Sequence, residues 1–475
     1  MSSNSSNHKI SSNKTSHNTL SIVALIILLI VFLLPLSQTN WYTVLYSLSP
    51  RIADSLKTNL DSDLNWSFIK KNPLLSTEPA KAPLPLSYKN FINGSFQKRF
   101  EDYFMRGNVL WGWLVKICNQ IAFTAFNQVN LTYGPPAFLG KEGYLMQSMY
   151  LNAFNRQKSL PEENYIKRVK KLKVLNDLLL EKHIPLLITI SPNIIELYPE
   201  LLPNHYKDPT RLTRKNGYEY MQKPLKESRI PVVDNFKILQ SLKDDLTELD
   251  IEKNEFRFFE RTGAHWNSIG SCIATNNIIA KISALTKKEL KQIPCSPAHL
   301  ENLKNDDDDL INVANLLFTE HYKKKALYIP EVQKLYETPP VRVLIIGTSF
   351  NFAILRLLNK SNIADTKFLF YYKSVYSKKK KGTPLKRNEI DWENDILKND
   401  VIILEANYSG LGKVGLEFVQ DAIRKLTLLK MTPAKLEQYK KRKANKKKKI
   451  KKALAKRINK NRINQDNEEF DPFPQ

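Results

Sequence analysis

Residues 341–350 read VRVLIIGTSF, which is the most informative stretch of the chain. The apolar residues of 341–346 predict a buried strand, and the pattern of 351–358 predicts a helix beyond a tight turn at Gly347. In a parallel sheet such a turn lies at the carboxyl end of its strand, beside the free amides of the following helix. The pattern would therefore expose the hydroxyl of Ser349 and makes it a candidate nucleophile.

A second segment, 260–267, reads ERTGAHWN and places a histidine just before another helical pattern. His265 would act as a general base if the fold brings its imidazole to Ser349. Asn267 favours a helix start because its short polar side chain can cap the first free amides. Taken alone, each residue also fits a structural role, since serines commonly cap helices and lone histidines are commonly hydrogen-bonded within a fold. Their combination favours acyl transfer.

The region 136–430 alternates predicted strands and helices. The strand patterns lie at 185–190, 230–233, 341–346, 367–372 and 401–404. Helical patterns lie between or after them, at 163–182, 268–285 and 416–429. This alternation predicts an α/β fold with a doubly wound, mostly parallel sheet and right-handed crossovers. The site of such a sheet lies at the carboxyl ends of its strands.

Residues 295–340 break the alternation, and we expect them to form an insertion over the site or at the sheet edge. The insertion contains the acidic run Asp306–Asp309. A calcium loop needs spaced ligands and a central glycine, whereas consecutive aspartates are typical of a solvated turn. We expect no metal and no cofactor, because the three cysteines and seven histidines lack the spacing of metal ligands.

The N-terminal part of the chain indicates a membrane protein. Residues 20–36 are apolar and uncharged, which predicts a transmembrane anchor over 20–37 after a short cytoplasmic segment, 1–19. A cleaved signal peptide is the alternative, but the residues after the run lack a small-x-small cleavage site. Positive charge before the anchor places the rest of the chain outside the cytoplasm. Residues 38–135 read as mostly helical, including the amphipathic 111–126.

The chain has 475 residues, 42% of them hydrophobic, and can bury a large core. Its formal net charge of +26 resembles that of a nucleic-acid-binding protein. About half of this charge lies in 435–462, within a lysine-rich tail (431–475) that we expect to be flexible or helical. Nucleic-acid binding is therefore disfavoured as the function of the folded part.

Four short motifs follow one another along roughly 90–425. They read GKEGYL at 140–145, ISPN at 190–193 with Tyr198-Pro199, TGAHWN at 262–267 and GTSFNF at 347–352. In this order they resemble the SGNH-hydrolase-like O-acetyltransferases of the alginate acetylation type, the AlgJ/AlgX-like family. The resemblance implies an SGNH-hydrolase-like sheet, Ser349 as nucleophile and His265 as base.

The resemblance also implies a function, a membrane-anchored O-acyltransferase outside the cytoplasm of a bacterium. Such an enzyme moves an acetyl group through a serine acyl-enzyme to a hydroxyl of a polysaccharide. A membrane-bound O-acyltransferase would supply the acyl group, and the inner membrane would hold the single-pass anchor. A carbohydrate esterase using the same serine and histidine, or a non-catalytic glycan-binding relative, are the alternatives.

The chain departs from the family at one position, since Gly263 stands where an aspartate orients the histidine. Loss of that carboxylate can cost about 10⁴ in rate. Glu260 and Asp234 are candidate replacements, and the spacing does not decide between them. Further site candidates are Asn351 for the oxyanion, and Arg261 and Trp266 for substrate binding.

Overall fold

The computed structural model describes Leu74 and residues 84–107, 109–130, 136–157, 159–248, 257–295, 297–301, 308–319, 322, 327–330, 332–377, 382–435 and 437–438. The predicted cytoplasmic segment (1–19), the predicted anchor (20–37) and most of the basic tail lie outside these residues. Among the helices described, none has both the length and the apolar character needed to cross a bilayer.

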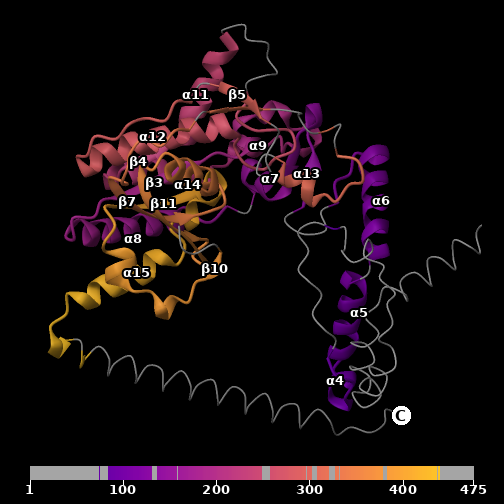
Figure 1. Ribbon diagram of the computed structural model, residues 1–475, viewed down its shortest axis with the longest axis horizontal. Coiled ribbons are helices and arrows are strands. Elements are labelled where there is room, and N and C mark those ends of the chain that lie inside the picture. Colours follow the sequence, from indigo (N-terminus) through magenta and orange to yellow (C-terminus); the bar gives the residue numbers. More distant parts are fainter. Residues whose placement is uncertain are drawn as a thin grey trace, which may run out of the picture.

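A seven-stranded sheet forms the centre of the molecule, in the order β10-β9-β8-β7-β11-β3-β4 (Figure 1). Its strands are β3 (Leu186–Ser191), β4 (Val232–Asp234), β7 (Val341–Gly347), β8 (Ala364–Phe370), β9 (Ser374–Ser377), β10 (Thr383–Pro384) and β11 (Val401–Asn407). Every neighbouring pair from β8 to β4 is parallel, whereas β9 and β10 extend one edge in antiparallel fashion. The predicted mixed α/β fold with a mostly parallel sheet is therefore confirmed.

Helices cover both faces of this sheet (Figure 1). On one face lie α11 (Asn235–Glu248), α12 (Ser268–Thr286) and α14 (Asn351–Lys360), which contact one another and the strands. On the other face α8 (Glu162–Leu180) packs against α10 (Gly217–Ser228) and α15 (Phe418–Leu429). The result is a three-layer α/β/α arrangement.

The central strands are buried on both sides, which explains their sequence. Residues 343–346 of β7 have no exposed surface, and every residue of β3 and β11 is buried. Strands covered by helices on both faces read as continuous hydrophobic runs rather than alternating ones. The predicted N-cap is also present, because the Asn267 side chain accepts a hydrogen bond from the Gly270 amide at the start of α12.

Smaller elements surround the sheet. They are the antiparallel pairs β1 (Ala137–Leu139) with β2 (Leu145–Gln147) and β5 (Pro297–Glu301) with β6 (Leu327–Pro330), and the helices α7 (Ser148–Phe154), α9 (Ile194–Leu197) and α13 (Asp309–Val313). Short 3-10 turns lie at Lys141–Gly143, Pro199–Leu201, Asn204–Tyr206, Arg211–Thr213, Arg387–Glu389 and Tyr408–Lys413, and a π turn at Trp392–Ile396. The predicted insertion thus carries β5, α13 and β6.

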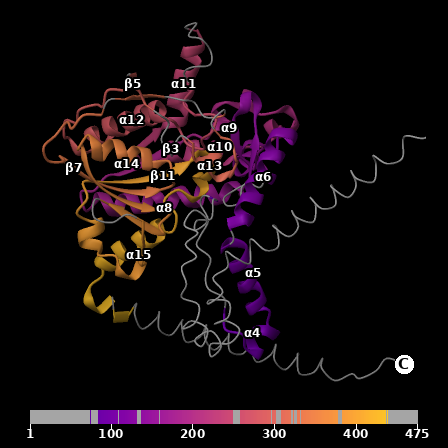
Figure 2. The same ribbon diagram turned by 45° about the vertical axis from the view of Figure 1, so that its right-hand side comes forward.

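Within the described residues, three helices precede the sheet domain. α4 (Tyr88–Ile92), α5 (Ser95–Gly107) and α6 (Val109–Phe126) form a column, with α6 beside the domain and α4 farthest from it (Figure 2). α6 covers the helix predicted from the pattern of 111–126. Its apolar side chains Trp113, Ile117 and Ile121 are exposed on one side, while Asn119 and Phe123 are buried on another.

Cys272 of α12 and Cys295 form a disulfide that closes a loop across 23 residues. We expect replacement of both by serine to lower the free energy of unfolding by about 3 kcal/mol, because the unfolded chain regains the entropy that this loop removes. Urea unfolding followed by circular dichroism measures the change. Cys118→Ser, which removes an exposed free thiol, is the matched control. Equal stability of the double variant and the wild type would contradict the expectation.

Candidate active site

Three side chains meet at the carboxyl end of the sheet. Ser349 follows β7, His265 precedes α12, and Asp309 is the first residue of α13. The Ser349 Oγ lies 2.6 Å from His265 Nε2, and His265 Nδ1 lies 2.6 Å from Asp309 Oδ2. Because a carboxylate only accepts hydrogen bonds, Nδ1 carries the imidazole proton and Nε2 accepts from the serine hydroxyl. The order is that of a serine, histidine and aspartate triad.

The backbone around His265 holds Asp309 firmly. The amide of Ala264 donates to Asp309 Oδ1 at 2.7 Å. The amides of Leu310 and Ile311 both donate to the carbonyl oxygen of Thr262, at 3.1 Å. The aspartate therefore receives hydrogen bonds on both oxygens and cannot rotate away from the imidazole without losing one of them.

Asp308, next to the triad acid, fastens α13 to the same segment. Its Oδ1 accepts a hydrogen bond from the Thr262 hydroxyl at 2.6 Å, and its side chain is buried. The prediction of a solvated turn over Asp306–Asp309 is thus wrong for Asp308 and Asp309, because packing of α13 turns both toward the 262–265 segment. Residues 306 and 307 lie outside the described part of the chain.

Asp309 supplies the carboxylate that Gly263 lacks, and sequence reasoning missed it. It lies 44 residues after His265 in the chain, within an insertion. No local spacing links the two. The acidic run was the only sequence signal, and its four identical residues gave no sign of which one faces inward.

A buried glutamate organises the turn beneath Ser349. Glu405 of β11 accepts hydrogen bonds from the Thr348 amide at 2.6 Å and from the Asn351 side chain at 2.7 Å. The Thr348 hydroxyl also lies within hydrogen-bonding distance of both Glu405 oxygens. Burial raises the pKa of Glu405, and the hydrogen bonds from Thr348 and Asn351 oppose that rise. The network fixes the backbone on either side of the candidate nucleophile.

Position 347 requires a glycine because the side chains of Glu405 and Asn351 approach its backbone closely. A Cβ placed there would lie 2.5 Å from both Glu405 Oε2 and Asn351 Nδ2, and 2.8 Å from Glu405 Cβ. We expect Gly347→Ala to destabilise the protein by about 1–3 kcal/mol, as overpacking of a core does, and to lower activity by displacing Ser349. Thermal unfolding and ester turnover test this. Gly410→Ala is the control, because nothing lies within 4 Å of its added Cβ, and equal melting temperatures for the two variants would count against the account.

The structure does not bring Glu260 or Asp234, the two carboxylates proposed from the sequence, to His265. Glu260 is buried and accepts a hydrogen bond from the Asn267 side chain at 3.0 Å. Asp234, at the end of β4, accepts from the Tyr218 hydroxyl at 2.5 Å and from the Lys237 amide. Neither replaces the family aspartate, because each is held by its own neighbours.

The remaining candidates also lie in other surroundings. The Asn351 side-chain amide donates to Thr348 O and to Glu405, so both its hydrogens serve the turn rather than an oxyanion. Trp266 is 3% exposed and packs edge-on against Phe350 in the core. Arg261 is exposed and does not line the cavity at Ser349.

Ser349 opens into a cavity of about 610 Å³. Aromatic and amide side chains make up much of its wall, among them Tyr150, Asn152, Gln157, Tyr218, Tyr371 and Tyr408. Of the described residues that line it, only Lys413 and the buried Glu405 carry charge. A mostly apolar wall with a few polar groups is typical of a small-molecule site.

Tyr371, which no sequence pattern indicated, lines the same cavity as Ser349. Its amide donates to the Gly347 carbonyl at 2.9 Å, and its φ of 48° lies in the left-handed region. Its hydroxyl hydrogen-bonds with the side chain and the backbone amide of Ser349. Burial raises the pKa of Tyr371, so the side chain stays a neutral phenol next to the candidate nucleophile.

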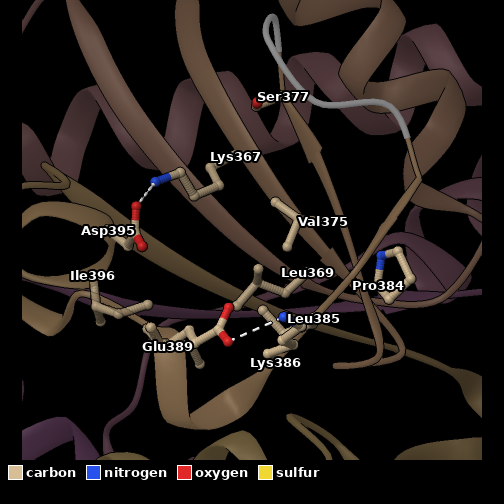
Figure 3. Close-up of a pocket in the computed structure, with 11 residues that line it drawn as sticks. Lys367, Leu369, Val375, Ser377, Pro384, Leu385, Lys386, Glu389, Asp395 and Ile396 are labelled. Atoms are coloured by element: carbon tan, nitrogen blue, oxygen red, sulfur yellow. Dashed lines mark hydrogen bonds and ion pairs between the residues drawn. The ribbon is translucent and has the colours of Figure 1, made fainter.

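A second cavity, of about 290 Å³, lies at the β8–β10 edge of the sheet (Figure 3). Lys367 and Asp395 form an ion pair in its wall, and Lys386 and Glu389 form another at 3.1 Å. Ser349, His265 and Asp309 do not line it. With its ionic groups already paired, this cavity offers no reactive constellation.

Comparison with known proteins gives structural neighbours but no close relative. No family model and no curated protein matches the sequence. The fold is similar to the O-acetyltransferase domain of Pseudomonas putida AlgJ, with 14% identity and a TM-score of 0.39 over 62% of this chain and all of that one. Bacillus cereus PatB1 gives 12% identity and a TM-score of 0.38, over 58% of this chain and 97% of that one. For Pseudomonas aeruginosa AlgX the values are 13% and 0.36, over 60% and 66%.

AlgJ and AlgX, the proteins that the motifs resemble, are thus also among the solved structures similar to this chain. Likenesses of this strength do not identify a reaction or a substrate.

Proposed function

We propose that the protein is an O-acyltransferase that carries an acetyl group on Ser349. The observation that carries this proposal is the hydrogen-bonded series from Ser349 Oγ through His265 to Asp309, with 2.6 Å at each step. A nucleophile, a base and an orienting acid in this order are what covalent acyl transfer needs.

In the first half-reaction Ser349 Oγ attacks the carbonyl carbon of the acyl donor while His265 Nε2 takes the hydroxyl proton. Asp309 accepts the hydrogen bond that Nδ1–H donates, and it stabilises the imidazolium that forms. The Ser349 amide, which hydrogen-bonds with Tyr371 in the free protein, would donate to the oxyanion. The leaving group departs with the proton from His265, and the serine is left as an acetyl ester.

In the second half-reaction an acceptor hydroxyl attacks the acetyl ester. His265 Nε2 removes the proton of the acceptor and returns it to Ser349 as the ester bond breaks. Water would give an esterase instead of a transferase through the same steps. Acceptor binding and exclusion of water from the cavity decide between the two.

Asp309 favours catalysis over the non-catalytic, glycan-binding alternative. Gly263 leaves no carboxylate at the position where the family has its aspartate, and Asp309 brings one to 2.6 Å from the imidazole.

A polysaccharide acceptor outside the cytoplasm completes the proposal. The motif resemblance and the apolar run of 20–36, which lies outside the described residues, support it from the sequence. The Cys272–Cys295 disulfide supports it from the structure, since disulfides persist mainly in oxidising compartments. Tyrosine and amide side chains in the cavity suit a polyhydroxylated ligand, because they offer flat faces and hydrogen bonds. A membrane-bound O-acyltransferase as the source of the acetyl group, and an inner-membrane location, rest on the sequence alone.

The test is a partition experiment with the full-length protein in detergent micelles. The protein is given an activated acetyl ester, first alone and then with neutral or uronic-acid oligosaccharides, and both free acetate and acetylated sugar are measured by mass spectrometry. We expect added acceptor to divert acetyl groups from water to sugar. Release of acetate that no acceptor reduces would show an esterase, and no reaction with the ester in folded protein would contradict the proposal.

A further inference from the structure

The helix that carries Asp309 is too short to hold its own position. α13 has five residues, and isolated helices of this length are not stable in water. Its N-terminal part is fixed by Thr262 and Ala264, as described above. Its C-terminal part needs other partners, because the last carbonyl groups of a helix find none within it.

Helix α6 provides those partners. The Asn119 side chain of α6 donates to the Ala314 carbonyl at the C-terminal end of α13, at 2.8 Å, and this bond is buried. The Gln120 side chain accepts from the Phe318 amide at 3.0 Å. The two bonds join segments separated by 195 and 198 residues of sequence, and Figure 1 shows α6 and α13 next to each other.

A small hydrophobic cluster, separate from the main core, fills the space between them. Phe123 of α6 packs there with Leu310, Ile311 and Ala314 of the α13 segment. Ala264, the neighbour of His265, belongs to the same cluster. Phe123 also meets the Tyr322 ring edge-on at 4.7 Å. Asn119 and Phe123 stand one helical turn apart on the same side of α6.

We propose that α6 is a splint for the catalytic acid: Asn119 and Phe123 hold α13 so that Asp309 stays on His265. Both are positioning residues, since neither lines the cavity at Ser349. This role explains why a polar Asn119 interrupts the apolar α6. It rests on the proposed acyl transfer, and it makes α6 part of the active enzyme.

The first arm of the test is kinetic. Asn119→Ala and Phe123→Ala, made in the full-length protein, should lower kcat by up to about 100-fold, as small displacements of catalytic groups do, and leave KM unchanged. In an Asp309→Asn background the same changes should cause no further loss, because the acid they position is already gone. Ile121→Ala, on the exposed side of the same helix, is the matched control and should keep wild-type kcat.

The second arm needs no substrate. The proton between His265 Nδ1 and Asp309 should give a far-downfield proton resonance in the wild type, absent in Asp309→Asn. We expect it to broaden or vanish in Asn119→Ala and Phe123→Ala and to persist in Ile121→Ala. Phe123→Leu, which keeps an apolar side chain, should restore it in part and serves if Phe123→Ala does not fold.

Two outcomes would overturn the splint. One is wild-type kcat and resonance in folded Asn119→Ala and Phe123→Leu, with or without a loss of thermal stability. The other is a loss of kcat that adds fully to that of Asp309→Asn. Because the resonance requires no turnover, a protein with no acyl chemistry would still give an answer about α6. Failure of the proposed function and failure of the splint are therefore told apart.

Discussion

Replacement of Ser349 by alanine should reduce turnover of an activated acetyl ester by about 10⁶-fold, because removal of the nucleophile from such a unit costs about as much as removal of all its members. The change deletes one oxygen and leaves the Glu405 network beneath the turn in place. Thermal unfolding should therefore stay close to that of the wild type.

The rate is measured with the full-length protein at substrate concentrations below KM. Ser374→Ala, in strand β9 and outside the cavity wall, is the serine control and should retain full activity. Residual turnover within tenfold of the wild type in Ser349→Ala would mean that another group attacks the ester.

Asp309→Asn should lower kcat by about 10⁴-fold. The asparagine amide can donate to His265 Nδ1, which favours the imidazole form with its proton on Nε2, and that form cannot accept the proton of Ser349. The side chain keeps its shape, so the loss reflects proton placement rather than packing. Loss of the far-downfield resonance in the same variant would link the rate to the hydrogen bond.

Asp308→Asn is the matched control for that change. It has the same chemistry one residue earlier, and its Oδ1 can still accept from the Thr262 hydroxyl. We expect it to lose no more than a few-fold in kcat. If Asp308→Asn and Asp309→Asn fell by the same factor, the acid would not be acting through His265.

The sheet and two members of the triad could be predicted from the sequence because their signals are local. Ser349 lies two residues after Gly347, the last residue of β7, and the buried strand, the tight turn and the helix each leave a pattern there. His265 lies just before a helix whose N-cap, Asn267, is also visible. In the parallel sheet, the carboxyl end of β7 and the N-terminal end of α12 then lie at the same edge.

Asp309 could not be predicted because its position depends on tertiary packing alone. It reaches His265 only when the cluster of Phe123, Leu310 and Ile311 seats α13, and those residues come from opposite ends of the chain. The alternation of side chains along an extended segment explains why Trp266 does not line the site as expected. His265 faces Ser349, so Trp266, its neighbour on the extended segment paired with Phe259, turns into the core instead of the cavity.

The most direct test of the account is the mass of the intact protein after brief exposure to an activated acetyl ester. Acyl transfer through Ser349 predicts a single acetyl adduct, mapped to Ser349 by peptide analysis, that Ser349→Ala does not form and that an acceptor sugar discharges from the wild type. An adduct on another residue, or turnover of the ester with no dependence on Ser349, would contradict it.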